Sequence, residues 1–229
     1  MKEFRILDLF SGAGGFSCGL DQVEGFQTEV ALDFDKSILN TFQMNFPQTK
    51  CICGSITDED VKSEVIKSAK QRGVHMVIGG PPCQGFSLKG KNLGLDDPRN
   101  FLFLEYVDIV RRLKPEIFVI ENVKNLIGAC KGYFISQIYD KFQALGYTLN
   151  HAVLNAYDFG VPQTRQRAII IGTLNPKGVK LPFKIDAPKR TVKDAISDLS
   201  YLESGEGERE SQYKTSPQSE YQKLLRGDR

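Results

Sequence analysis

The chain has 229 residues, of which 41% are hydrophobic and 25% charged, and its net charge of +2 permits nucleic-acid binding without requiring it. No apolar run approaches bilayer-spanning length and the first residues leave no room for a signal peptide, so we expect a soluble cytoplasmic protein with no membrane partner. The five cysteines are odd in number and lack Cys-x-x-Cys spacing, which supports neither a disulfide framework nor a metal site.

Apolar strand-like runs alternate with segments of helical periodicity as far as residue 174. This alternation predicts an α/β fold with a mostly parallel, doubly wound sheet. The last two strands are separated only by residues 157–166, too few for a helical crossover, so they should form an antiparallel hairpin. The expected strands cover residues 5–10, 28–34, 50–54, 75–80, 117–123, 147–156 and 167–174, and the expected helices cover residues 14–24, 35–45, 58–71, 98–113 and 131–145.

The first expected strand leads into residues 8–16, Asp-Leu-Phe-Ser-Gly-Ala-Gly-Gly-Phe, a glycine-rich turn that opens a helix. Exposed backbone amides in such a turn can approach a ligand closely, which indicates a nucleotide-like cofactor. The spacing does not fit the dinucleotide fingerprint, because Ser17 stands where the third glycine should be, and a phosphate-binding Gly-Lys-Ser/Thr is absent. A tight turn without a ligand is the alternative interpretation.

The next strands end in residues that carry chemistry. Asp33 and Phe34 could hold a ribose and stack on a base. Cys83 lies in the Gly- and Pro-rich segment 79–87, just beyond an apolar run, where ligand sites of open α/β sheets are found. A small buried thiol is the alternative. A thiol hydrolase would need a histidine beside this cysteine, and neither histidine of the chain has an evident placement there.

Glu121 closes the strand 117–123, where a carboxylate either forms a structural ion pair or works as an acid. Arg165 and Arg167 open the last strand, where alternation would send both side chains to one face. A solvated edge with a basic stripe is the other interpretation of this arginine pair. From about residue 175 the α/β pattern fails, and the polar segment 203–220 predicts a mobile surface loop.

Taken in order, four segments resemble the motifs of the cytosine-5 DNA methyltransferase family. Residues 8–16 resemble its cofactor signature, 79–87 its nucleophile loop, 121–123 (Glu-Asn-Val) its acid motif and 163–167 (Gln-Thr-Arg-Gln-Arg) its arginine motif. The resemblance runs from about residue 4 to 174. It implies a sheet of the S-adenosylmethionine-dependent methyltransferase type and methyl transfer from S-adenosylmethionine to carbon 5 of cytosine in double-stranded DNA, in a restriction-modification setting.

The resemblance also implies catalytic roles. Cys83 would add to carbon 6 of the ring, and Glu121 would protonate or hydrogen-bond N3. Arg167 would contact the oxygen on carbon 2 with support from Arg165. The target cytosine must first flip out of the duplex. Residues 84–99 resemble the loop that closes over the flipped base, and the DNA contacts expected within it are Gln84, Ser87, Lys89, Lys91 and Arg99.

For the cofactor, the resemblance assigns residues from four strand ends and from the helix after the nucleophile loop. Ser55 stands where the family usually has an aspartate that accepts a hydrogen bond from the adenine amino group, so a weaker neutral contact is expected there. The expected cofactor residues are Phe10, Gly12, Gly14 and Gly15 at the amino-acid end, Asp33 on the ribose, Phe34, Ser55 and Ile56 around the adenine, and Pro82 and Leu102 at the border of the pocket.

Family members carry a target recognition domain and two further motifs, which are not found before Arg229. We therefore expect a catalytic domain over residues 1–175 and the incomplete start of a linker or recognition region over 176–229. The chain would be part of a longer enzyme, or the catalytic subunit of a split methyltransferase that is inactive without its partner. The same motifs would also fit an RNA (tRNA) cytosine-5 methyltransferase, and a catalytically idle scaffold is the non-enzyme interpretation. A bacterial DNA enzyme would be nucleoid-associated.

Overall fold

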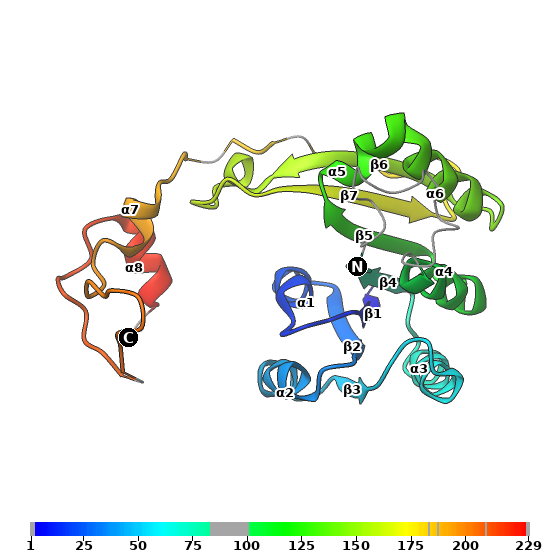
Figure 1. Cartoon of the computed structure of the whole chain (residues 1–229), viewed down its shortest axis with the longest axis horizontal. Helices are drawn as coiled ribbons and strands as arrows, with labels where there is room; N and C mark the ends of the chain where they lie inside the picture. The colour runs from blue at the N-terminus through cyan, green and yellow to red at the C-terminus, as the bar shows by residue number, and fades with distance from the viewer. Residues whose placement is uncertain (1–2, 83–100, 183, 187, 209, 228–229) are drawn as a thin grey trace. The chain divides into compact units, whose positions relative to one another are not determined.

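The computed structural model describes residues 3–82, 101–182, 184–186, 188–208 and 210–227. Within these residues, seven strands form one sheet in the order β3-β2-β1-β4-β5-β7-β6. Strands β1 to β5 pair in parallel, β7 is antiparallel to β5, and Figure 1 shows the arrows of β6 and β7 running in opposite directions. The mostly parallel, doubly wound sheet that the sequence predicts is confirmed, as is its terminal antiparallel hairpin.

The elements lie within a few residues of their expected positions. The strands are β1 Phe4–Leu9, β2 Phe26–Asp33, β3 Lys50–Cys53, β4 Met76–Gly79, β5 Ile117–Val123, β6 Thr148–Asn155 and β7 Gln166–Thr173. The helices are α1 Gly15–Asp21, α2 Lys36–Asn45, α3 Glu59–Gln71, α4 Phe101–Leu113, α5 Asn125–Gly128, α6 Tyr133–Gln143, α7 Val192–Ile196 and α8 Glu220–Arg226, with short 3-10 helices η4 Ala129–Gly132 and η5 Ala156–Phe159.

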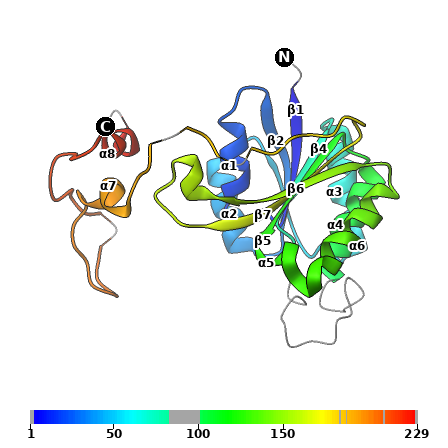
Figure 2. The ribbon, with the colours of Figure 1, turned by 90° about the horizontal axis from the view of Figure 1, so that it is seen from above.

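Helices cover both faces of the sheet, with α1 and α2 on one side and α3, α4 and α6 on the other (Figure 2). Successive side chains along each strand point to opposite faces of the sheet and so contribute to both core layers. Val30 and Leu32 lie in the core under α3 and α4, whereas Ala31 packs with α2. Two aspartates cap the helices that follow β2 and β3. The carboxylates of Asp35 and Asp58 each accept hydrogen bonds from two amides in the first turn of α2 and α3.

The β5–β7 pair carries a close contact between an aromatic ring and a glycine. Phe118 lies directly opposite Gly172, and a Cβ atom on Gly172 would stand 2.2 Å from the Phe118 ring. The absence of a side chain on β7 lets the ring lie flat over the strand and stack on Phe142, with ring centroids 4.0 Å apart. This contact favours the alignment in which Phe118 opposes Gly172.

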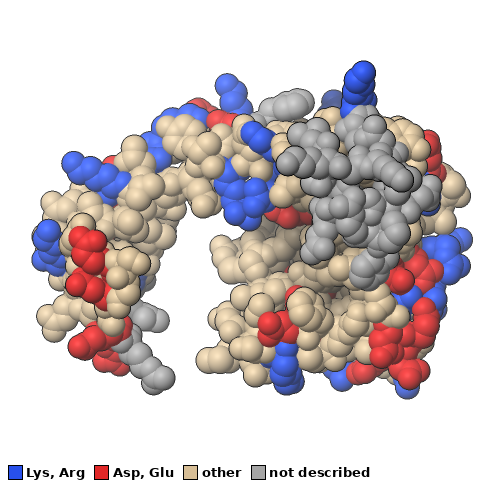
Figure 3. All heavy atoms as spheres, viewed as in Figure 1, with Lys and Arg blue, Asp and Glu red and all other residues tan. Residues whose placement is uncertain are grey.

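A charge network joins α3 to α4. The Lys62 side chain is only 3% exposed, and its ammonium group contacts the carboxylates of Glu59 at 2.7 Å, Asp108 at 3.6 Å and Glu105. A buried cation is tolerated when several carboxylates surround it. Figure 3 shows basic and acidic side chains intermixed over these two helices. The network holds α4, whose first turn carries Leu102.

The chain divides into two compact units, one made of Met1–Val153 with Arg167–Leu181 and the other of Leu154–Gln166 with Pro182–Arg229. In the second unit α7 packs on α8 through polar contacts: the buried Gln222 amide donates to Ser197 Oγ at 2.9 Å, and Arg226 pairs with the buried Asp198. No hydrophobic side chain is fully buried in the described part of this unit. None of the helices described for the chain is long and apolar enough to cross a membrane.

Candidate functional site

Register brings four strand ends to one edge of the sheet. Leu9 at the end of β1 pairs with Leu32 of β2 and with Gly79 of β4, and Gly79 pairs with Ile120 of β5. Ligands bind beyond the carboxyl ends of parallel strands, so the residues that follow these four positions form the candidate site.

The turn after β1 is shaped by three residues with positive φ: Phe10 at 60°, Gly12 at 54° and Gly14 at 94°. Gly14 precedes α1 and must lack a side chain, because a Cβ atom there would lie 2.5 Å from the Phe46 ring of the segment after α2. Open space surrounds the missing Cβ of Gly12, so the backbone on that side of the turn is accessible.

Asp33, the last residue of β2, is held by backbone donors from two segments. The Gly12 amide donates to its Oδ2 atom at 2.8 Å, and the Asp35 amide donates to Oδ1 at 3.0 Å. These bonds fix the carboxylate beside the glycine turn, where it can still accept hydrogen bonds from a bound hydroxyl group.

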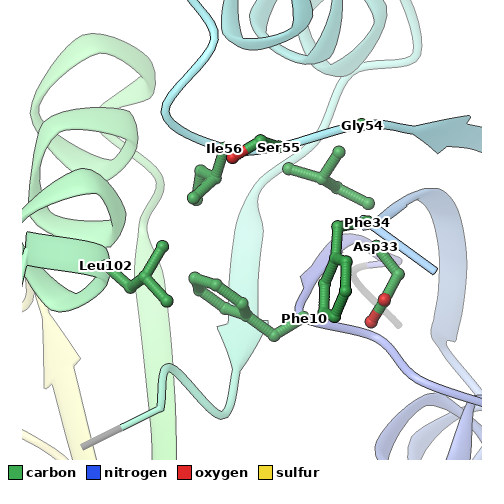
Figure 4. A pocket seen from close by; sticks show the side chains of 8 residues that line it. Phe10, Asp33, Phe34, Gly54, Ser55, Ile56 and Leu102 are labelled. Carbon is green, nitrogen blue, oxygen red and sulfur yellow. The ribbon is translucent and has the colours of Figure 1, made fainter. Parts of the chain in front are cut away.

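A pocket opens next to this carboxylate. Figure 4 shows the side chains of Phe10, Ile56 and Leu102 turned toward one another, and the Phe34 ring at the border is 77% exposed. An exposed aromatic ring beside an apolar recess provides a platform for a planar ring. The pocket is lined by Phe10, Leu32, Asp33, Phe34, Gly54, Ser55, Ile56 and Leu102, a set that includes six of the expected cofactor residues.

The remaining expected cofactor residues stand elsewhere. Gly12, Gly14 and Gly15 form the turn beside the pocket, and Pro82 is exposed and not among the described lining residues. The Ser55 hydroxyl lies 2.7 Å from Thr57 Oγ1 and also accepts from the Thr57 amide.

Two polar residues of the turn region, Asp8 and Ser11, were not among the expected site residues. Asp8 is buried at the end of β1, where loss of solvation raises the pKa of its carboxyl to about 7 although the Ser17 hydroxyl donates to it at 2.6 Å. The Ser11 hydroxyl is also buried and has no hydrogen-bond partner within the described structure. A buried hydroxyl without a hydrogen-bond partner destabilises the fold unless a ligand supplies that partner. The position of Ser11 inside a glycine-rich turn was a sequence signal that could have identified it.

Glu121 of β5 and Arg167 of β7 form an ion pair. Arg167 Nε donates to Glu121 Oε1 at 2.8 Å, and the side chains of Arg167 and Glu121 are 28% and 33% exposed respectively. In the β5–β7 register Glu121 opposes Ile169 and Val123 opposes Arg167, so the pair is diagonal on one sheet face. A partly exposed carboxyl and a partly exposed guanidinium are thus held together across β5 and β7.

The expectation that alternation sends Arg165 and Arg167 to one face stays a prediction, because Arg165 directly precedes β7, which begins at Gln166. Arg165 belongs to the loop before the strand, in the second unit, where its amide donates to Asn155 Oδ1 at 3.1 Å.

Asn122 links the acid motif to the start of the nucleophile segment. Its buried side-chain amide donates to the carbonyl of Pro81 at 2.9 Å, and its Oδ1 atom accepts from the Val123 amide. The contact ties β5 to the residues that lead toward Cys83. The predicted residues Cys83, Gln84, Ser87, Lys89, Lys91 and Arg99 lie outside the described residues, so their roles stay predictions.

The strand order, with β7 inserted antiparallel beside β5, and the glycine turn at the end of β1 define the class of S-adenosylmethionine-dependent methyltransferases. Residues 4–226 match the family model for C-5 cytosine-specific DNA methylase. The chain belongs to this family, as the four motifs predict.

Relatives and solved structures agree. The chain is 39% identical to the Type II methyltransferase M.AquIA of Picosynechococcus, covering 86% of this chain and 89% of the relative. It is 40% identical to the Type II methyltransferase M1.HphI of Haemophilus parahaemolyticus, covering 87% of this chain and 54% of that one. A prophage-encoded protein of E. coli, described as a DNA modification methyltransferase, superposes with a TM-score of 0.71 at 28% identity, covering 87% of this chain and 56% of that one.

The chain therefore spans most of M.AquIA but about half the length of M1.HphI and 47% of M.XorII of Xanthomonas oryzae. Relatives of different lengths share this part.

Proposed function

We propose that this chain is the catalytic part of an enzyme that transfers a methyl group from S-adenosylmethionine to carbon 5 of cytosine in double-stranded DNA, through a covalent adduct of Cys83. The observation that carries the proposal is the ion pair between Glu121 and Arg167. Beside Glu121, the Asn122 side chain donates to the carbonyl of Pro81 and so anchors the segment that leads to Cys83. The Type II names of its relatives favour a restriction-modification role.

The pocket residues fit the cofactor. Phe34 and Ile56 would hold the adenine, the fixed Asp33 carboxylate would accept hydrogen bonds from the ribose hydroxyls, and the glycine turn would face the amino-acid end. The unpaired Ser11 hydroxyl fits a polar ligand at that turn. When bound, S-adenosylmethionine supplies an electrophilic methyl group.

The chain's own residues would prepare the base. The Cys83 thiolate would form a bond to carbon 6, and the displaced electron pair would make carbon 5 nucleophilic. Glu121 would protonate or hydrogen-bond N3, and Arg167 would bind the oxygen on carbon 2 while its ion pair orients Glu121. Carbon 5 would then accept the methyl group, with S-adenosylhomocysteine as the leaving group. Loss of the carbon 5 proton to a base and breaking of the S–C6 bond would return Cys83 to the thiolate.

We further propose that target recognition is supplied by a separate recognition domain or by a second subunit. A DNA substrate would place the protein in the cytoplasm, at the nucleoid of a bacterium.

The substrate class is tested by methyl transfer from labelled S-adenosylmethionine to unmethylated duplex DNA and, in parallel, to tRNA, with the protein as its gene encodes it. We expect label in DNA, at carbon 5 of cytosine after nucleoside analysis. Label confined to tRNA would overturn the DNA proposal in favour of RNA methylation, and label in neither would contradict both.

Replacing Phe34 by alanine should weaken binding of S-adenosylmethionine about 5- to 150-fold, since stacking of a base on an aromatic side chain is worth about 1–3 kcal/mol. Titration calorimetry measures the change. Met44→Ala is the matched control, because Met44 is 83% exposed on α2 and does not line the pocket. Equal affinity of the Phe34→Ala and Met44→Ala variants would remove Phe34 from the adenine site.

A further inference from the structure

The loop between β6 and β7 carries Arg165, and a later segment of the second unit holds this loop in place. The Ile185 amide donates to the carbonyl of Asp158 at 3.2 Å. The Lys189 ammonium donates to the Asp158 carboxylate at 3.0 Å and lies 4.4 Å from the centre of the Tyr157 ring. The loop is therefore attached to a strap about thirty residues further along the chain, defined here as residues 184–191 without the undescribed residue 187.

Arg190 makes the contact that joins this loop to a second element. Its Nη1 atom donates to the carbonyl of Gly160 at 3.2 Å, and its guanidinium carbon lies 4.3 Å from the centre of the Tyr221 ring of α8. A planar guanidinium can donate from its edge while its face stacks on a ring, which an ammonium group cannot do. Arg190 thus bridges the loop and α8.

The position of Arg165 depends on this loop. Its amide donates to Asn155 Oδ1 at 3.1 Å, and its carbonyl accepts from the Ala156 amide at 3.0 Å. Both backbone groups of Arg165 are therefore set by the residues that begin the loop, while Gly160, four residues after Ala156, is set by Arg190. A loop bound at both its base and its tip has little freedom to redirect the side chain it carries.

We propose that Arg190 is a positioning residue for Arg165, and that it couples the α7–α8 part of the protein to methyl transfer. The inference rests on the proposed function and on the role that the family resemblance implies for Arg165, which is to support Arg167 at the cytosine site. It requires no contact of Arg190 with the substrate. Arg190 acts by holding Gly160 and stacking on Tyr221, so that the order of the loop depends on α8.

The test compares Arg190→Ala and Arg190→Lys with Lys184→Ala, an exposed lysine of the same strap. Hydrogen exchange of the hydrogen-bonded amides of Ala156 and Arg165 reports on the loop, and we expect exchange about 10-fold faster in Arg190→Ala than in the natural protein. The value of kcat for DNA methylation should fall about 10- to 100-fold, the scale of a misplaced positioning group. The affinity for S-adenosylmethionine should not change, because its pocket is built from the first unit.

Arg190→Lys should give intermediate values, since lysine can still donate to Gly160 but does not stack in the same way. Should Arg190→Ala fail to fold, Tyr221→Ala removes the stacking partner and should reproduce both effects, whereas Tyr221→Phe keeps the ring and should resemble the natural protein.

If Arg190→Ala exchanges faster but keeps its kcat, Arg190 is not a positioning residue for Arg165. If its hydrogen exchange is unchanged, Arg190 does not hold the loop to α8. A natural protein that methylates neither DNA nor RNA would contradict the proposed function, while the exchange measurement would still decide whether Arg190 holds the loop.

Discussion

Replacing Cys83 by serine is expected to lower methyl transfer to DNA by about 10⁴-fold or more, the scale of losing a catalytic nucleophile. A hydroxyl group is far less ionised than a thiol at neutral pH and is a poorer nucleophile toward carbon 6. The affinity for S-adenosylmethionine should stay nearly unchanged, because no cofactor contact is assigned to this residue. Initial rates with labelled cofactor and calorimetry on the same variant separate the two effects.

A trapping experiment identifies the thiol directly. Cytosine with fluorine at carbon 5 blocks the final proton loss, so the natural protein should remain covalently attached to such DNA through Cys83. Cys18→Ser is the matched control, since this cysteine is exposed on α1 and should be dispensable. An adduct mapped to Cys18, Cys51, Cys53 or Cys130, or an adduct formed by Cys83→Ser, would refute the mechanism.

Glu121→Gln and Arg167→Ala should each lower kcat by about 10²- to 10⁴-fold, the range for removing a positioned acid or its partner. Glutamine can still hydrogen-bond N3 but cannot protonate it. Arg167→Ala removes the proposed contact to the base and also frees the Glu121 carboxylate from its 2.8 Å ion pair. DNA binding, measured by gel shift, should persist in both variants.

The double variant decides whether the two residues act together. Because their side chains are bonded, the combined loss should be much smaller than the product of the single losses. If the losses in kcat of the two single variants multiply in the double variant, the ion pair is incidental to catalysis. Lys124→Ala changes the charge of an exposed residue just after β5 and serves as the control.

Much of the fold could be predicted because it depends on apolar periodicity. The strand Ile117–Val123 was expected at the same bounds, and Tyr106, Ile109 and Val110 face the core from α4 as their spacing predicts. Prediction failed where short elements depend on caps instead of apolar faces. Helix α7 was not expected, although Thr191 and Asp194, which form its capping box, were a readable signal.

The candidate site was less predictable because its geometry depends on register. Sequence alone could identify Glu121 and Arg167 as chemically interesting, but not that a diagonal pairing of β5 and β7 brings them together. Strand alternation could not place the Arg165 side chain, because this residue precedes β7, which begins at Gln166. Side-chain contacts such as Asn122 with Pro81 have no periodic signal at all.

Gly172 affects the register in which β5 and β7 pair. If β7 shifted by two residues along β5, every side chain would stay on its own face of the sheet, so burial alone does not exclude this register. The shift would nevertheless move Arg167 by about 7 Å relative to Glu121. In either slipped alignment the ring of Phe118 would meet Ile170 or Leu174 in place of the glycine it opposes in the native sheet. Gly172 therefore favours the native pairing of β5 with β7 over a two-residue slip, and a larger residue there would remove this preference without touching any reacting group.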